Sequence, residues 1–483
     1  MDRGASRILG RGSIYTLASV APMLTGLLVT PALTRLMPKG EYGDVSVGLA
    51  LMQFALGLLT FGLPLVITRH AFVDSSGIDG ARSLVLSGTT ISAVTALGVA
   101  GALVALSAAV DGSPLWYLAL AILTGGAGAS LAMSQSFALA MDASWYYVAM
   151  AFAMSLIAPC VGLAVVATFT SDATTDLAGV TAVFGLTAAA ALAWAGHGSR
   201  PASRATVVEA LRLGLPLVPH QLAIGSATGA AVLVARWQLG PGGAADAQIA
   251  IWLGSAPLMI VSAIGYAWLP QILGVAEEER GASLAETSQT IAWLAALGAG
   301  TLAMTSPWFL RVLVPAEYDV DAMVETTSIV VMSSAVATIF LAHMQIVIAT
   351  GQTKRFALGS PLILVLGVAV GAAALPFLGL GGLGVGYVVT YVGLAVLARH
   401  EARRHSPVRW SMSRLWPALA AVSALSIGSA TLPDTGLVPT VVRLCVATAC
   451  IVAALILMAR TLQRGSAPAP APKPDPAVAK DPS

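Results

Sequence analysis

Long apolar runs alternate with short polar joints along this chain, from about residue 13 to residue 459. Each run has about 20 residues, the length that an α-helix needs to cross ~30 Å of hydrocarbon. A helix is expected for every run, because lipid offers the backbone no hydrogen-bond partners of its own. The pattern predicts about fourteen spans, at 13–34, 45–68, 84–109, 115–140, 146–169, 177–196, 213–236, 248–271, 289–313, 323–349, 357–378, 382–399, 414–433 and 437–459.

Two of the joints are short enough to have two interpretations. The joint from Met141 to Ser144 and the glycine-rich joint from Gly379 to Gly382 either separate two spans or mark one broken helix. The expected number of spans is therefore 12 to 14, since the boundaries of spans are the least certain feature of such a prediction.

The distribution of basic residues predicts the orientation in the membrane. The chain has 25 Lys and Arg residues, and most of them fall in the joints on one side, together with both ends of the chain. Cytoplasmic joints carry this excess in membrane proteins. Both termini are therefore expected in the cytoplasm and the spans in the cytoplasmic (inner) membrane. A cleavable signal peptide is not expected, because the first apolar run continues to Thr34.

A weak internal repeat relates the joint after the first span to the joint after the seventh. Arg35, Pro38 and Asp44 in the first copy correspond to Arg236, Pro241 and Asp246 in the second. Parallel repeats of this kind are typical of transporters built from two lobes. The predicted organisation is a cytoplasmic segment at 1–12, a first six-helix lobe at 13–196, a cytoplasmic inter-lobe loop at 197–212, a second six-helix lobe at 213–399, two additional spans within 414–459, and a disordered, Pro/Ala-rich cytoplasmic tail at 465–483.

Composition excludes several classes of function. With 57% apolar and 10% charged residues the chain is not a soluble domain, and no joint is long enough to house a catalytic site. Cys160, Cys445 and Cys450 lie inside spans without metal-ligand spacing. The GxGxxG pattern from Gly379 to Gly384 joins two membrane helices and follows no strand. We therefore expect no enzyme activity, no cofactor, no metal site and no nucleic-acid partner.

The basic residues at the ends of spans are the first candidates for a binding site. Arg35, Arg69 and Arg236 close spans 1, 2 and 7, where together they would form a cationic cleft. For each arginine taken alone, including Arg443 near the outer end of the last span, snorkelling to the membrane surface is the simpler explanation.

Polar residues inside the spans are the second group of candidates, because a charge near the bilayer centre costs at least ~2.5 kcal/mol. His220 lies inside the cytoplasmic end of span 7 beside Gln221, which suggests a cytoplasmic entrance, and His343 lies at similar depth in span 10. The alternative is that these groups are packed and hydrogen-bonded. The candidates for ion coupling are three acids at helix ends, Asp44, Asp246 and Glu325.

Five segments in a characteristic order resemble the polysaccharide-transporter family of Wzx-like O-antigen flippases, within the multidrug/oligosaccharidyl-lipid/polysaccharide (MOP) exporter superfamily. They are Thr34–Gly43, Gly62–Leu65, Gly214–His220, Val314–Tyr318 and Ala349–Arg355. The resemblance implies an all-α polytopic fold of 12 to 14 helices in two lobes, like that of MATE transporters. Two departures stand out, because Ala231-Val232 and Ala245-Asp246-Ala247 occupy positions where many relatives have an Asp-Arg pair and a Gly-x-Tyr.

The resemblance also implies a function. The chain would be a flippase that moves a polyprenyl-diphosphate-linked oligosaccharide, or a polysaccharide precursor, across the membrane by alternating access of its lobes. Its partners would be this lipid-linked substrate, membrane lipid, and the polymerase and export machinery of lipopolysaccharide or other surface polysaccharides. The alternatives are a lipid II flippase, a cation-coupled drug exporter and, from other classes, a membrane polymerase or glycosyltransferase, or a non-transporting scaffold for glycan assembly.

Overall fold

The computed structural model describes residues 22–74, 76–111, 115–262, 277–350, 354–406, 408 and 410–465, and within these ranges the chain is helical with no strand. The predicted N-terminal segment 1–12 and the tail beyond residue 465 lie outside the described residues. The first described helix covers residues 22–36, and a short helix covers 256–262. The labelled helices are α2 (Lys39–Leu59), α3 (Leu63–Val73), α4 (Gly77–Asp111), α5 (Trp116–Ala140), α6 (Ser144–Phe152), α7 (Ala158–Thr168), α8 (Ala173–Ala195), α9 (Arg204–Gly214), α10 (Val218–Gly225), α11 (Ala227–Gly254), α13 (Glu277–Leu313), α14 (Val320–Val330), α15 (Met332–Thr350), α16 (Lys354–Leu378), α17 (Gly381–His405), α18 (Trp416–Thr431) and α19 (Leu437–Gly465).

The all-α membrane fold expected from the sequence is confirmed, and every predicted span overlaps a described helix. Within the described ranges, nine helices are long and apolar enough to cross a membrane, or ten if the bent pair Arg204–Ala223 and Ala227–Gly254 is one span. The first predicted span begins before residue 22, and α18 has only 16 residues. The total of fourteen therefore stays a prediction.

Both short joints separate helices that lie side by side. α5 ends at Ala140 and α6 begins at Ser144 after a turn in which Asp142 has a φ of 59°. α16 ends at Leu378 and α17 begins at Gly381, with Gly379 at a φ of 54°, a conformation that favours glycine. Each joint is thus a reversal of the chain between two spans.

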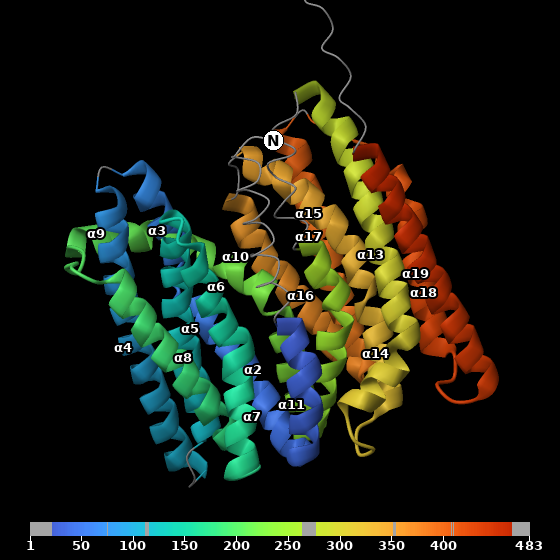
Figure 1. Cartoon of the computed structure of the whole chain (residues 1–483), viewed down its shortest axis with the longest axis horizontal. Coiled ribbons are helices and arrows are strands. Elements are labelled where there is room, and N and C mark those ends of the chain that lie inside the picture. The colour runs from blue at the N-terminus through green and yellow to red at the C-terminus, as the bar shows by residue number, and fades with distance from the viewer. Residues whose placement is uncertain are drawn as a thin grey trace, which may run out of the picture.

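The helices form two bundles, which Figure 1 shows on the left and on the right. The first bundle contains α2 to α8, and the second contains α11 and α13 to α17, with α18 and α19 packed on α13. The segment predicted as an inter-lobe loop contains a helix, α9, which packs on α3 and α4 of the first bundle. The close contacts between the bundles run along α2, which packs on α5 and α8 on one side and on α10 and α11 on the other.

Small residues explain why the helices approach so closely. A methyl group added at Gly125 of α5 would lie 2.5 Å from the Ala55 side chain of α2. In the second bundle, one added at Gly386 of α17 would lie 2.4 Å from the main-chain oxygen of Gly367 in α16. Membrane helices gain little from burying apolar surface against one another, so close van der Waals packing of this kind is what holds the bundles together.

The last two helices are attached by a buried arginine, contrary to the expectation that Arg443 snorkels. The Arg443 side chain is 1% exposed and donates hydrogen bonds to the main-chain oxygens of Ser429 (2.9 Å) and Leu432 (2.7 Å) and to the Ser429 hydroxyl (3.1 Å). Ser429 in turn donates to the Ala303 carbonyl of α13. The carbonyls that α18 leaves unpaired at its end are the reason why the cation is buried here.

Candidate functional site

Two ion pairs cross between the bundles at the end of the molecule where α2 begins, which we call the junction end. Lys39 Nζ of α2 lies 2.8 Å from Asp246 Oδ2 of α11, and Arg236 Nε of α11 lies 3.3 Å from Asp44 Oδ1 of α2. Each joint of the internal repeat thus supplies one acid and one base to the other. The Lys39–Asp246 pair is partly shielded, with side chains 21% and 11% exposed, whereas Arg236 is 39% and Asp44 24% exposed, so the second pair is screened more by salt.

The backbone conformation of Gly240 allows α11 to contribute both Arg236 and Asp246 to the junction. It has a φ of 79° and a ψ of −171°, which interrupts α11 immediately before Pro241. Arg236 lies before this break and Asp246 after it, and both pair with the first residues of α2. Further from the break, Gly229 lies against Ala50 and Trp252 against Gly26. Contacts at increasing depth on both sides show that the chain reverses direction at Gly240.

The backbones of the two bundles touch at the same place. A methyl group added at Gly43 of α2 would lie 1.9 Å from the main-chain oxygen of Pro241. A methyl group added at Gly40, three residues earlier in α2, would have no such neighbour within 4 Å. The joint after the first span therefore needs a glycine at position 43, where it packs against the reversal of α11.

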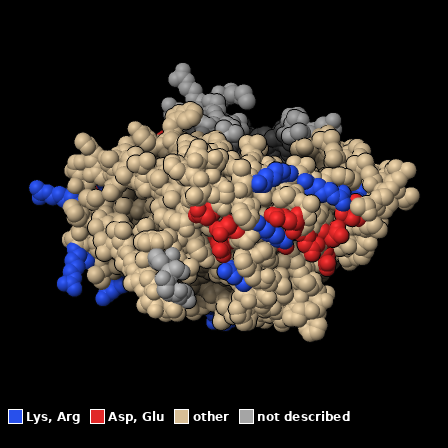
Figure 2. Space-filling view, turned by 90° about the horizontal axis from the view of Figure 1, so that it is seen from below, with Lys and Arg blue, Asp and Glu red and all other residues tan. Residues whose placement is uncertain are grey.

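The junction end carries a band in which basic and acidic side chains alternate, as Figure 2 shows, and further basic residues lie apart from it at the left edge of that view. Lys39 lies over the ring of Tyr318 at 4.9 Å, and Arg35 donates hydrogen bonds to the main-chain oxygens of Pro31 (2.7 Å) and Val312 (2.9 Å). Burial raises the pKa of the Tyr318 hydroxyl, so this side chain stays neutral beneath the ammonium group. Arg311 forms an ion pair with Asp434 in the same region.

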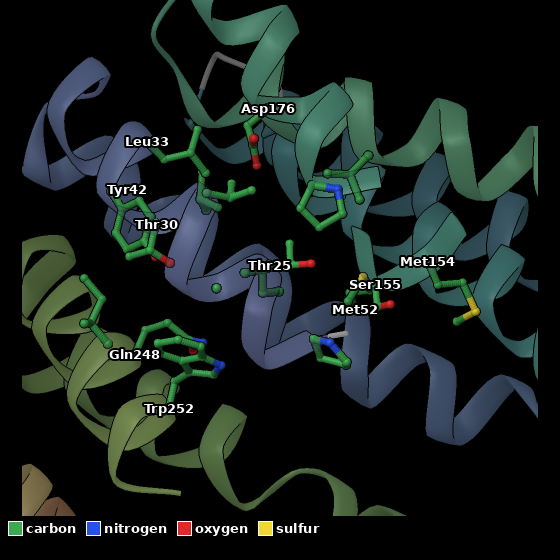
Figure 3. A pocket seen from close by; sticks show the side chains of 18 of the residues that line it. Thr25, Thr30, Leu33, Tyr42, Met52, Met154, Ser155, Asp176, Gln248 and Trp252 are labelled. Atoms are coloured by element: carbon green, nitrogen blue, oxygen red, sulfur yellow. The ribbon is translucent and has the colours of Figure 1, made fainter. Parts of the chain in front are cut away.

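A cavity of about 250 Å³ lies beneath the junction, between the helix at 22–36, α2, α7, α8 and α11 (Figure 3). Its polar lining includes Thr25, Thr30, Tyr42, Asp176 and Gln248. Residues Ala153–Ile157 form a π-helix that precedes α7, and Met154 and Ser155 of this turn face the cavity. Such π-bulges are frequent at functional sites because they re-aim side chains within a helix.

The three candidate arginines do not share one cleft. Arg35 and Arg236 lie at the junction end, whereas Arg69 is an exposed residue of α3, beyond the other end of α2. α2 has 21 residues, so the two positions are separated by roughly 30 Å at 1.5 Å per residue. A single bound diphosphate cannot contact all three.

The two candidates for the entrance lie in α10. The His220 ring nitrogen Nδ1 is 2.8 Å from the Ser360 hydroxyl of α16, and the ring meets Phe356 edge-on at 4.9 Å. Gln221 is exposed. His343 donates a hydrogen bond of 2.8 Å from Nδ1 to the carbonyl of Ile339 in its own helix. His220 is thus a packed residue that links two helices, and Gln221 is the more accessible of the pair.

The three acids proposed for ion coupling have different environments. Asp44 and Asp246 belong to the crossed ion pairs. Glu325 is half-buried in α14, and a methyl group added at Gly381 of α17 would lie 2.8 Å from its Oε1 atom. Only the first two contact residues of the other bundle.

Asp176 is not among the candidates from the sequence, because it lies one residue before the predicted start of span 6 and therefore falls in a joint. α8 begins at Ala173, because Asp172 caps it by accepting a hydrogen bond from the Thr175 amide at 2.9 Å. Burial alone would raise the pKa of Asp172, but hydrogen bonds from Thr170 and Thr175 lower it. The spacing Asp172-x-x-x-Asp176 was the available signal, since a cap at the first aspartate places the second inside the helix.

A family model described as polysaccharide biosynthesis protein matches residues 9–273, which include the junction and the cavity. The chain belongs to this family. The resemblance read from the sequence is therefore confirmed at the level of the family. A search of curated proteins found no match.

Solved structures of MATE transporters have the same fold. An inward-facing multidrug resistance MATE family transporter of the MOP superfamily aligns with a TM-score of 0.55 and 14% identity, covering 85% of this chain and 99% of that one. An outward-facing structure of such a transporter gives 0.55 at 13% identity, with 86% and 96% covered. A MOP superfamily transporter from Pyrococcus furiosus gives 0.53 at 13% identity over the same shares. The family member described here thus has a transporter fold, and the equal scores favour neither conformation.

Proposed function

We propose that this protein exports a polyprenyl-diphosphate-linked oligosaccharide across the cytoplasmic membrane by alternating access of its two bundles. The observation that carries the proposal is the junction, where four charged residues hold the bundles together through pairs that a relative movement would break. Charge pairs of this exposure are weak enough to open and close in each cycle. Membership of a polysaccharide biosynthesis family supports a glycan substrate.

The physical task fits a protein of this kind. A diphosphate and several sugars would lose their hydration in hydrocarbon, and an ionised group moved there without partners costs far more than thermal energy. The lipid tail stays in the bilayer, so only the polar head needs a path. The membrane potential, negative inside, would favour outward movement of two negative charges by about 4–5 kcal/mol per 100 mV. No nucleotide is required for such a step.

The arginines take separate roles in this proposal because the structure separates them. Arg69, with Gln221 and His220 on α10, would meet the diphosphate on the cytoplasmic side. Arg35 and Arg236 would bind it at the junction end, which the distribution of basic residues predicts to face outward. A diphosphate bound to Arg236 would compete with Asp44 for its guanidinium group, so substrate binding and opening of the junction would be linked.

Deletion of the gene tests the proposal directly. Lipid-linked repeat units should accumulate in the inner leaflet, and surface polysaccharide should disappear. Leaflet-specific glycan labelling distinguishes the units in the inner leaflet from those in the outer leaflet. A plasmid copy of the wild type should restore both, whereas a copy with R236E should not. Normal surface polysaccharide in the deletion strain would refute the proposal, and accumulation of lipid II in place of repeat units would favour a lipid II flippase.

A cation-coupled drug exporter is the second candidate, and one structural observation favours it. Such an exporter needs a carboxylate within the membrane, and the buried Asp176 provides one. The drug susceptibility of the deletion strain separates the candidates. Increased sensitivity to several unrelated cationic drugs, with normal surface polysaccharide, would establish the exporter.

A further inference from the structure

Helix α9, in the linker between the two bundles, has an exposed apolar side. It begins after Ser203, whose hydroxyl accepts a hydrogen bond from the Thr206 amide at 3.2 Å. Ala210 faces the bundle and is fully buried. Val208, in contrast, is 41% exposed, and Leu215 in the turn that follows α9 is 48% exposed. Apolar side chains exposed together in this way indicate a contact outside the chain.

Two arginines border this apolar side. At about 3.6 residues per turn, Arg204 and Arg212 lie on the same side of α9 as Val208, and both are exposed. Among the described residues, neither guanidinium group forms an ion pair with an acid of the chain. Glu209, the one acid in α9, lies about 100° from Val208 around the helix axis. An apolar strip bordered by arginines is typical of a helix that lies in the surface of a membrane.

The orientation and depth of α9 fit this position. The segment Arg204–Ala223 is bent by 60° from α11, and Figure 1 shows α9 at the edge of the first bundle, across the direction of α4 and α8. Ala210 and Leu211 pack against the same apolar cluster as Trp194, whose ring stacks on Tyr146 at 4.3 Å. The Tyr146 side chain is 51% exposed. Tryptophan and tyrosine gather where hydrocarbon meets water, so α9 lies at the depth of the membrane surface.

Basic side chains project beyond the helices on the same side of the molecule. Figure 2 shows them at the left edge, and Figure 1 places α9 at that edge. Arg200, which precedes α9, adds a third exposed guanidinium group to those of Arg204 and Arg212. α4, on which α9 packs, exposes apolar side chains such as Leu97 (63%), so lipid surrounds this side of the bundle. The arginines therefore extend towards lipid headgroups, and anionic headgroups complement their charge.

We propose that α9 binds the headgroups of anionic phospholipids in the leaflet on its side of the membrane, which the distribution of basic residues predicts to be the cytoplasmic leaflet. Val208 and Leu215 enter the region between the headgroups and the acyl chains. The guanidinium groups of Arg204 and Arg212 each contact phosphate oxygens, which they match because their N–H donors can form two parallel hydrogen bonds. A soluble phosphate has no apolar part for the strip, whereas a lipid supplies both parts.

The contacts at the end of α9 indicate what such a lipid would affect. A methyl group added at Gly214, the last residue of α9, would lie 2.5 Å from the main-chain oxygen of Phe61, in the break between α2 and α3. The chain then continues into α10, where His220 bonds to Ser360 of the second bundle. A lipid that binds one arrangement of the bundles more tightly would shift the equilibrium towards it. This consequence rests on the proposed function, but lipid binding itself does not.

The test uses the purified full-length protein in phosphatidylcholine nanodiscs with increasing fractions of a spin-labelled lipid, without any sugar or drug. The native cysteines are changed to alanine, and V208C carries a fluorophore that the spin label quenches on contact. The spin-labelled lipid has either a phosphatidylglycerol or a phosphatidylcholine headgroup on the same acyl chains. R204Q/R212Q is compared with the parent. R404Q/R414Q, which removes two exposed arginines of α17 and the turn before α18, is the matched control.

Phosphatidylglycerol should reach half-quenching at a mole fraction at least roughly threefold lower than phosphatidylcholine, because two guanidinium groups attract it. R204Q/R212Q should abolish this preference, and R404Q/R414Q should keep it. Both variants change only exposed side chains, so both should fold. The absence of quenching by either lipid would place α9 in water and overturn the proposal. Equal quenching by both lipids, or a preference that R204Q/R212Q retains, would also overturn it.

A soluble diphosphate is the other source of the same chemistry. Pyrophosphate is therefore added in excess and compared with sodium chloride at the same ionic strength. A preference for phosphatidylglycerol that is equal in both supports the lipid surface. One that only pyrophosphate removes would overturn the proposal in favour of a site for soluble diphosphates. Since no export is measured, failure of the proposed function and failure of lipid binding give different results.

Discussion

The two halves of the molecule match at their junction and differ in their interiors. At the junction, each half gives one acid and one base to the other, through Lys39 and Asp44 on one side and Arg236 and Asp246 on the other. Further in, a cavity of about 250 Å³ lies between the first half and α11, whereas the space between α11, α16 and α17 in the second half is about 10 Å³. The joints of the two halves are thus equivalent, but the spaces inside the molecule next to them are not.

The difference assigns different tasks to the two bundles. In the second bundle, Gly367 and Gly386 bring α16 and α17 into backbone contact, and Tyr387 is buried with its hydroxyl bonded to Thr228. Such packing leaves little room for movement or water. In the first bundle, a hollow lined by an acid and hydroxyls lies beside α11. The second bundle is thus closely packed at α16 and α17, whereas the first borders a cavity that contains an acidic side chain.

The largest expected effect comes from placing a leucine in each interior. In G386L, the side chain meets the backbone of Gly367 and Gly371, so the helices must separate at a cost of about 3 kcal/mol. The apparent Tm of the purified protein should fall by several degrees. S155L points into the cavity of the first bundle and should leave the Tm near that of the wild type while export falls. G98L, on a part of α4 where nothing lies within 4 Å, is the control. Equal losses of Tm in G386L and S155L would show that the two interiors are packed equally closely.

Charge reversal at the junction should have the next largest effect. D44R places two cations side by side, and such a repulsion costs about 2 kcal/mol in a partly shielded site. Export, measured as surface polysaccharide per molecule of protein, should fall roughly 30-fold, since each 1.36 kcal/mol is a factor of ten. The double variant D44R/R236D restores an ion pair and should recover most of the activity. If the double variant is no better than D44R, the pair does not hold the bundles together.

The sequence predicted most of the fold and only part of the site. Spans can be read from apolar runs because a backbone in lipid must be helical, and the repeat placed Asp44 and Asp246 in equivalent joints. It did not show that these joints exchange partners, because pairing depends on the reversal at Gly240, a backbone angle that no residue pattern fixes. Asp176 and Arg443 were misjudged for a similar reason. Both lie near the ends of apolar runs, where sequence cannot distinguish a side chain that reaches water from one that turns inward.

A change in the close backbone contact at the junction should have a smaller effect than charge reversal. G43A places a methyl group against the Pro241 carbonyl, so α2 and α11 must shift, at a cost of about 1 kcal/mol. G40A adds the same methyl group to the same helix where nothing lies within 4 Å. Disulfide crosslinking of cysteines placed at positions 39 and 246 reports how often the junction is closed. It should be slower in G43A than in G40A, and equal rates would show that the reversal of α11 does not depend on the glycine.

The smallest expected effect concerns the hydrogen bond between His220 and Ser360, which ties α10 to the second bundle. Hydrogen bonds between membrane helices contribute about 0.6 kcal/mol on average. A double-mutant cycle with H220A and S360A should therefore give a coupling energy of this size in thermal unfolding. His343 is the control, because its ring bonds within its own helix and a cycle of H343A with S360A should give none. A coupling of 2 kcal/mol or more between His220 and Ser360 would place a strong polar interaction in the second bundle and weaken the contrast between the two interiors.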